Sequence, residues 1–136
     1  MFLEEWSRDK DNVKIVSNKI NGVDGHDIGH FKVFGSDMLF THGHRGRIDT
    51  VVQDLSLMLK MFPETIFTAH LHHSASGEEH KIDHIQNPAL AMTDDYAISI
   101  RKSARQRQKL VIYENDNDTA NMKTVHYLEP KSLKQK

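Results

Sequence analysis

Apolar side chains in this chain recur mostly at alternate positions, in short runs separated by polar turns. Alternation of this kind predicts β-strands, because successive side chains of a strand point to opposite faces of a sheet. The segment 21–29 is rich in Asn, Asp and Gly and is therefore expected to be a loop. The predicted strands cover residues 13–16, 30–34, 37–42, 65–69, 80–86, 109–114 and 123–129. We expect hairpins between 30–34 and 37–42 and between the last two strands, and an exposed strand at 80–86.

The longest helical pattern lies at 48–62, where apolar residues recur every three or four positions and Pro63 helps to end the helix. This helix connects strand 37–42 to strand 65–69. Two strands joined through a helix lie parallel and adjacent in one sheet. Shorter helices are predicted at 2–10 and at 93–104. Together these elements predict an α/β fold with a mixed β-sheet and flanking helices.

Composition places the chain among globular proteins with one core. Its 136 residues are 38% hydrophobic and 27% charged. We expect one domain over residues 1–130 and a flexible basic tail over 131–136. No apolar run approaches the ~20 residues that cross a bilayer, and the acidic amino-terminal segment does not resemble a signal peptide. The sequence therefore predicts a soluble cytoplasmic protein that does not engage a membrane.

Charge and cysteine content narrow the chemistry. The chain has 18 basic and 19 acidic residues, so it lacks the charge excess of a general nucleic-acid binder, and we do not expect direct nucleic-acid binding. It has no cysteine, which excludes disulfides and thiolate metal sites. Any metal must then be held by nitrogen and oxygen ligands, and ten histidines can provide them.

Two pairs of histidines stand at the ends of predicted strands. His42 and His44 lie at the end of strand 37–42, and His70 and His72 lie at the end of strand 65–69. Because neighbouring parallel strands end at the same edge of a sheet, the two pairs are expected to converge. Three imidazoles with a fourth ligand fit tetrahedral Zn²⁺, with Mn²⁺ as the alternative. The competing interpretation is that these histidines bind only backbone groups and water.

These motifs resemble those of the calcineurin-like metallophosphoesterase superfamily, particularly its phage members. The family has a histidine motif after a strand, often HGH, followed later by GHxH; residues 42–44 read HGH and residues 69–72 read AHLH. The segment DDYA at 94–97 is similar to a stretch that follows the second motif in phage proteins of this type. The likeness covers residues 34–130 and implies half of the family's αββα sandwich.

Carried over by position, the resemblance implies that His42 and His70 bind one cation, that His72 binds the other, and that His44 lies near the phosphate. The family's earlier motifs DxH, GDxxD and GNH(D/E) have no convincing counterpart. The DGH at 24–26 matches DxH by its letters, but only sixteen residues separate it from His42, which leaves no room for the two motifs between them. We therefore predict an incomplete centre with no catalytic residues.

Other residues are candidates for supporting roles. Additional metal ligands could come from Asp24, His26 and Asp37, for which surface roles compete. Five cations within nine residues form a candidate partner-binding surface, although no aromatic residues interleave with them to stack bases. These cations are Arg101, Lys102, Arg105, Arg107 and Lys109. The competing interpretation is a solvated helix end beside a strand.

Three functional hypotheses follow from these residues. The first is a non-catalytic zinc-binding phage protein, derived from a metallophosphoesterase, that inhibits a bacterial host defence protein. Its size, phage-like sequence and incomplete centre resemble small phage anti-CRISPR proteins that inhibit Cas9. The second is an active metal-dependent phosphodiesterase or nuclease, or a fragment of one. The third is a structural module with unliganded histidines.

Overall fold

The computed structural model of the protein describes residues 2–16, 19–20, 23–24, 26–43, 50–70, 75–88 and 106–129. Two helices and nine strands are placed within these ranges. They are α1 (Phe2–Ser7), β1 (Lys19–Ile20), β2 (Val23–Asp24), β3 (Ile28–Val33), β4 (Ser36–Thr41), α2 (Val51–Leu59), β5 (Thr65–Thr68), β6 (Ala75–Glu79), β7 (Ile82–Gln86), β8 (Gln108–Asp116) and β9 (Thr119–Leu128). Neither of these helices has the length and apolar character that crossing a membrane requires.

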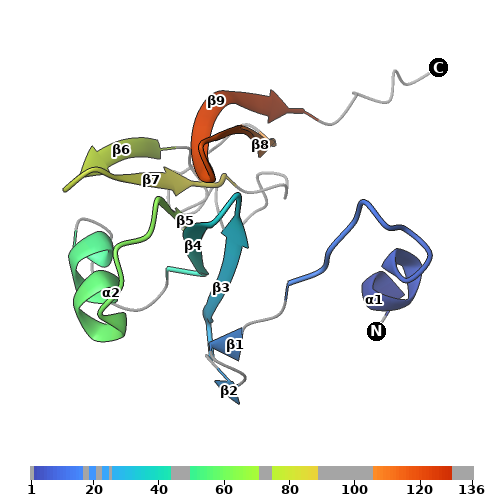
Figure 1. Cartoon of the computed structure of the whole chain (residues 1–136), viewed down its shortest axis with the longest axis horizontal. Helices are drawn as coiled ribbons and strands as arrows, with labels where there is room; N and C mark the ends of the chain where they lie inside the picture. Colours follow the sequence, from blue (N-terminus) through green and yellow to red (C-terminus); the bar gives the residue numbers. More distant parts are fainter. Residues whose placement is uncertain are drawn as a thin grey trace, which may run out of the picture.

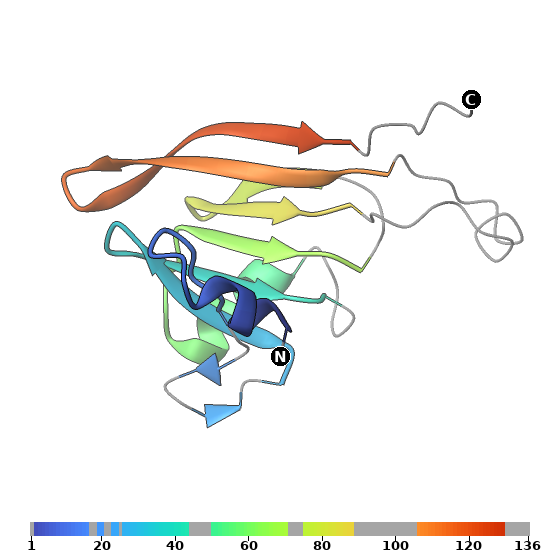
Figure 2. The same ribbon diagram turned by 90° about the vertical axis from the view of Figure 1, so that its right-hand side faces the viewer.

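A five-stranded mixed sheet forms the centre of the fold, in the order β3-β4-β5-β7-β6. Its three inner strands, β4, β5 and β7, are parallel, and the outer strands β3 and β6 each pair antiparallel with their neighbour. The carboxyl ends of the three parallel strands therefore lie on one side of the molecule (Figure 2). The predicted hairpin of β3 and β4 and the predicted parallel pairing of β4 with β5 are confirmed, as is the α/β class.

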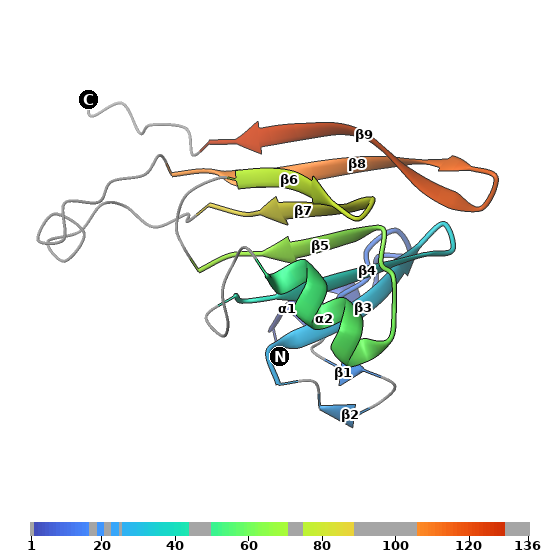
Figure 3. The same ribbon diagram turned by 90° about the vertical axis from the view of Figure 1, so that its left-hand side faces the viewer.

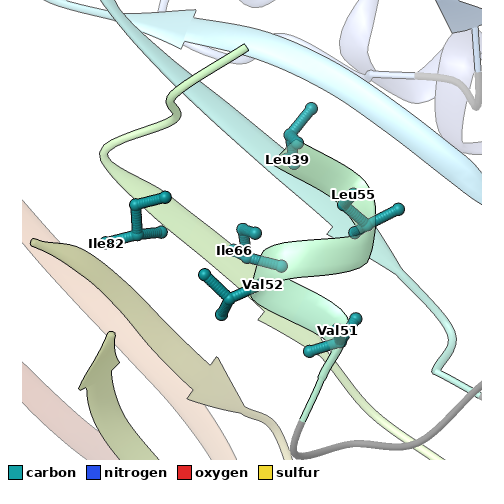
Figure 4. Packing of buried hydrophobic residues seen from close by; sticks show 6 residues of the cluster. All are labelled: Leu39, Val51, Val52, Leu55, Ile66 and Ile82. Atoms are coloured by element: carbon teal, nitrogen blue, oxygen red, sulfur yellow. The ribbon is translucent and has the colours of Figure 1, made fainter. Parts of the chain in front are cut away.

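Helix α2 connects β4 to β5 and packs its apolar side on one face of this sheet. The cluster between them joins helix residues to Leu39 of β4, Ile66 of β5 and Ile82 of β7 (Figure 4). The helix residues of the cluster are Val51, Val52 and Leu55. Burial of branched aliphatic side chains of this kind contributes about 1.5–3 kcal/mol each. The cluster therefore anchors the crossover that brings β4 and β5 together.

The second face of the sheet carries aromatic residues and the β8–β9 hairpin. The rings of Phe31 and Phe67 lie 6.3 Å apart, on the side opposite Ile66 because side chains alternate along a strand. The Tyr113 hydroxyl of β8 lies 2.7 Å from the Thr65 hydroxyl, which attaches the hairpin to β5. Figures 1 and 3 show β6, β7 and β5 between the hairpin and α2. The predicted carboxyl-terminal hairpin is confirmed.

Several predicted elements differ from the structure. Residues 13–16 form no strand, and the expected loop at 21–29 contains β2 and the beginning of β3. The strand predicted as exposed is β7, which lies between β5 and β6 with Ile82 and Ile85 buried. The predicted helix at 93–104 and the tail at 131–136 lie outside the described residues.

Candidate metal centre

The site forms where β4 and β5 end side by side. His42 follows the last residue of β4, and His70 comes two positions after the last residue of β5. The two strands are in register, with Phe40 opposite Phe67, and the Ala69 N–H donates to the His42 carbonyl oxygen at 3.3 Å. His70 has φ of 61°, so the chain turns sharply there after leaving the sheet. This turn presents the His70 ring beside that of His42.

The two imidazoles meet through one nitrogen each. His70 Nδ1 lies 3.2 Å from His42 Nε2, the ring centroids are 5.0 Å apart, and the rings are inclined by 71°. Both residues are exposed to solvent. Two nitrogen ligands of a tetrahedral zinc ion, each ~2.0–2.1 Å from the metal, stand ~3.3 Å apart. The donor set and its spacing therefore fit two ligands of one divalent cation.

Hydrogen bonds around Thr41 support the strand end that carries His42. The Thr41 hydroxyl donates to Asp27 Oδ2 at 2.9 Å and accepts the Gly43 N–H at 3.3 Å. Gly43 has φ of 83°, which glycine adopts without strain. Asp27 and Thr41 are supporting residues that sequence reasoning missed. Only the β3–β4 register, in which Ile28 pairs with Thr41, indicates that Asp27 lies close enough to bond Thr41.

The other candidate ligands fall in different places. His44 and His72 lie outside the described residues, and Asp24 lies in β2, where only the backbone is described. His26 precedes β3 at the same edge as His42, with φ of 57°. Across the described part of the chain, no group of three His, Asp or Glu side chains is placed to hold a metal ion. Of the candidate ligands, the described residues bring together His42 and His70.

Asp37 does not belong to this centre. It lies near the amino end of β4, five residues before His42, or ~16 Å along an extended strand. Its Oδ1 is 2.7 Å from His30 Nε2 and 2.8 Å from Lys32 Nζ. The Lys32 hydrogen bond lowers the pKa of Asp37, with smaller help from His30, against the opposing effect of burial. The expectation that Asp37 could ligate the metal is corrected by this position.

The amino edge of the parallel strands carries acidic side chains. Glu64 and Asp83 stand beside the first residues of β5 and β7, and the Asp83 N–H donates to the Glu64 carbonyl oxygen at 3.0 Å. Burial raises the pKa of Glu64, and the charge of Asp83 raises it further. Burial and Glu78 likewise raise the pKa of Asp83. The charged forms of Glu64 and Asp83 therefore oppose folding.

Comparison with known proteins identifies a similar fold. It assigns no family, because no family model matches the chain. The chain is 28% identical over 91 residues to the SPbeta prophage-derived uncharacterized protein YonJ of Bacillus subtilis strain 168, an alignment covering 62% of this chain and 22% of that protein. A Streptococcus pneumoniae protein described as a predicted phosphoesterase is structurally similar, with a TM-score of 0.51 at 17% identity over 76% of this chain and 53% of that one. A single mutant of Vps29 from Entamoeba histolytica gives a TM-score of 0.53 at 10% identity over 82% of this chain and 64% of that one.

These similarities define the class of fold as phosphoesterase-like. The predicted mixed sheet with flanking helices, related to the metallophosphoesterase architecture, is confirmed. The chain spans about half to two-thirds of the length of these two structures and about a fifth of the prophage protein. The identities are low, so the likeness concerns the fold and not the activity.

Proposed function

We propose that this chain is a metal-binding protein in which His42 and His70 hold one divalent cation at the carboxyl edge of a phosphoesterase-like sheet. The observation that carries the proposal is the 3.2 Å separation of His42 Nε2 and His70 Nδ1 on adjacent parallel strands. Zn²⁺ is the first candidate, because imidazole nitrogens in tetrahedral geometry suit it, and Mn²⁺ is the alternative. His44 and His72 remain the proposed sources of further ligands.

We infer that the site binds a partner and does not hydrolyse phosphoesters. Two-metal hydrolysis needs two cations about 3.5–4 Å apart. In the metallophosphoesterase family that this sequence resembles, a carboxylate bridges the two cations. No described carboxylate forms a metal-holding group with the histidine pair. A single bound cation would instead tie the ends of β4 and β5 together and fix their connecting segments. The residues that perform this task are the two imidazoles and the Thr41–Asp27 hydrogen bond behind them.

The alternative function is metal-dependent phosphodiester hydrolysis, either by this chain or as part of a larger assembly. This alternative is kept because the chain covers only 53% and 64% of the two structural relatives. The bridging carboxylates that catalysis needs could then come from a region that has no counterpart in this chain. The two functions differ in one measurable respect, which is turnover.

We also propose a bacterial host defence protein as the partner, with Cas9 as the first one to assay. Similarity to a prophage-derived protein supports a phage setting for this chain, although it does not point to Cas9 itself. The assay is cleavage of a target DNA by Cas9 with and without the purified chain. Undiminished cleavage at excess chain would remove Cas9 from the proposal and leave the metal site standing.

The metal proposal is tested by elemental analysis of protein purified without added metal. We expect close to one zinc or manganese per chain in the parent, and loss of most of it in His42→Ala and His70→Ala. His80→Ala is the matched control, because His80 is also exposed but lies in the β6–β7 turn beside Glu79. Retention of full metal content by both site variants would contradict the proposal.

Turnover of a generic phosphodiester with added Mn²⁺ separates binding from catalysis. The binding function predicts no activity above the metal-only background. Activity that is present in the parent and abolished in His70→Ala would establish the alternative instead.

A further inference from the structure

Strand β8 begins beside the histidine edge of the sheet. The Asn87 N–H, just after β7, donates to the Thr68 carbonyl oxygen of β5 at 2.7 Å, and the Asn87 Oδ1 accepts the Lys109 N–H at 2.8 Å. Gln108 Nε2 also donates to the Pro88 carbonyl oxygen at 2.9 Å. These bonds hold the start of β8 against the end of β7, which lies two strand spacings, or ~10 Å, from β4. Figure 2 shows the ends of β4, β5, β7 and β9 and the start of β8 on the same side.

A cation–aromatic cluster stands at this start of the hairpin. The Arg107 guanidinium carbon lies 4.0 Å from the ring centroid of Tyr127, and Lys109 Nζ lies 5.7 Å from it. Lys109 and Tyr127 are directly opposite in the β8–β9 register, so the arrangement is set by the backbone. Tyr127 is 45% exposed. Within the described residues, no carboxylate forms an ion pair with Arg107 or Lys109.

We propose that Arg107, Lys109 and Tyr127 form a binding site for single-stranded nucleic acid. The two cations provide charge for backbone phosphates, and the Arg107 guanidinium, held over the Tyr127 ring, provides a planar group on which a base stacks. An acidic protein surface would use the two charges but would have no specific need for the phenol ring. The expectation of no direct nucleic-acid binding rested on the balanced charge and on the absence of aromatics within residues 101–109, and β9 provides the missing aromatic across the hairpin.

The test is fluorescence anisotropy of a labelled oligo(dT) 12-mer in low salt and EDTA, which keeps the measurement independent of any metal. We expect binding by the parent chain, at least tenfold weaker binding by the Arg107→Ala/Lys109→Ala variant, and a salt dependence whose slope falls by ~0.7 for each lost phosphate contact. Tyr127→Ala should weaken binding several-fold, and Tyr127→Phe should retain it.

Lys123→Ala is the matched control, because Lys123 lies on β9 but pairs with Glu114 at 3.2 Å toward the other end of the hairpin. Its affinity should equal that of the parent. Lys109 Nζ donates to the Ala75 carbonyl oxygen, so Arg107→Gln alone serves where the double variant unfolds. The proposal would be overturned if the folded parent did not bind the oligonucleotide. It would also be overturned if the parent and Tyr127→Ala bound equally well and polyglutamate competed equally with both. That second result would identify an acidic protein partner.

Discussion

Gly29 in β3 has almost no space for a side chain. A Cβ atom at this position would stand 2.0 Å from Cζ of Phe40, on the neighbouring strand β4. The Phe40 ring also packs at 6.1 Å from the Phe31 ring, so it cannot move away without disturbing that pair. The close approach of β3 to an aromatic ring of β4 therefore requires glycine.

We predict that Gly29→Ala lowers the free energy of unfolding by about 1–3 kcal/mol, the usual cost of overpacking. Gly77→Ala is the control, because a Cβ there meets nothing within 4 Å. That variant should be neutral or slightly stabilising, since alanine restricts the unfolded chain more than glycine does. Urea unfolding monitored by circular dichroism measures both variants. Equal stability of the two would show that Phe40 yields easily.

The carboxylates at the amino edge of the sheet make opposite contributions to stability. The raised pKa of Glu64 means that the folded state binds its proton more tightly than the unfolded state does, so this group reduces stability as the pH rises above about 4.5. The lowered pKa of Asp37 has the reverse sign. Its contribution is present above the ordinary value of 3.8 and is lost as the pH falls through the lower folded value.

We therefore predict that Glu64→Gln raises the free energy of unfolding at pH 7 and flattens its decline between pH 4 and 7. Asp37→Asn should lower the free energy of unfolding at pH 7 by about 0.2–1 kcal/mol, the usual range for a partly exposed ion pair. Urea titrations at pH 4, 5, 6 and 7 measure both effects. A stability loss at pH 7 in Glu64→Gln would mean that this carboxylate supports the fold.

At the scale of elements, helix α2 carries two leucines of very different burial. Leu55 is 7% exposed and packs in the cluster against β4 and β5, whereas Leu57 is 69% exposed. Both are leucines near the middle of one helix, so their helix propensities are matched. Any difference between their alanine variants then reports packing alone.

We predict that Leu55→Ala destabilises the protein by about 2–5 kcal/mol and that Leu57→Ala changes stability by less than about 0.5 kcal/mol. The larger cost arises because Leu55→Ala leaves a cavity against the sheet. Thermal and urea unfolding of the two variants provide the measurement. Similar losses in both would indicate that something covers the outer side of α2 in solution.

The end of α2 illustrates which details of an element the sequence could not provide. Apolar spacing predicted a helix through Phe62, ended by Pro63, but Lys60 adopts a left-handed conformation with φ of 49° and ends the helix at Leu59. The Lys60 and Met61 N–H groups then bond to carbonyl oxygens of the last turn. Phe62 consequently leaves the helical face and is 84% exposed, because local backbone geometry overrides the periodicity.

At the scale of the whole molecule, the connections that the sequence pattern encodes were predictable. A strand that ends at His42, a helix, and a strand that ends before His70 implied parallel neighbours, and this alone brought the two imidazoles to one edge. Strand β6 was not predictable, because its residues ASGEE have no apolar alternation, and without it β7 was expected to be exposed. Pairing of Lys109 with Tyr127 depends on a register that begins at the tight turn around Asn117, which composition does not fix.

The same edge leads to a prediction for the stability of the whole chain. A cation that binds only the folded state stabilises it by about 2.7 kcal/mol at a free concentration 100 times the dissociation constant. For a domain of this length, that free energy corresponds to a rise in melting temperature of roughly 5–10 °C. We therefore expect zinc added after EDTA treatment and dialysis to raise the melting temperature of the parent and of His80→Ala by this amount.

The His42→Ala/His70→Ala variant should show little or no rise in melting temperature, because it lacks the imidazole nitrogens that bind the metal in the folded state. Scanning calorimetry with and without zinc makes the comparison, and the size of the rise with zinc concentration gives the affinity. Adventitious binding to surface histidines would raise the melting temperature of all three proteins equally. A site at the ends of β4 and β5 would raise the melting temperature of the parent and of His80→Ala but not that of the double variant. An equal rise in all three would leave the two adjacent imidazoles as a hydrogen-bonded pair at the edge of the sheet.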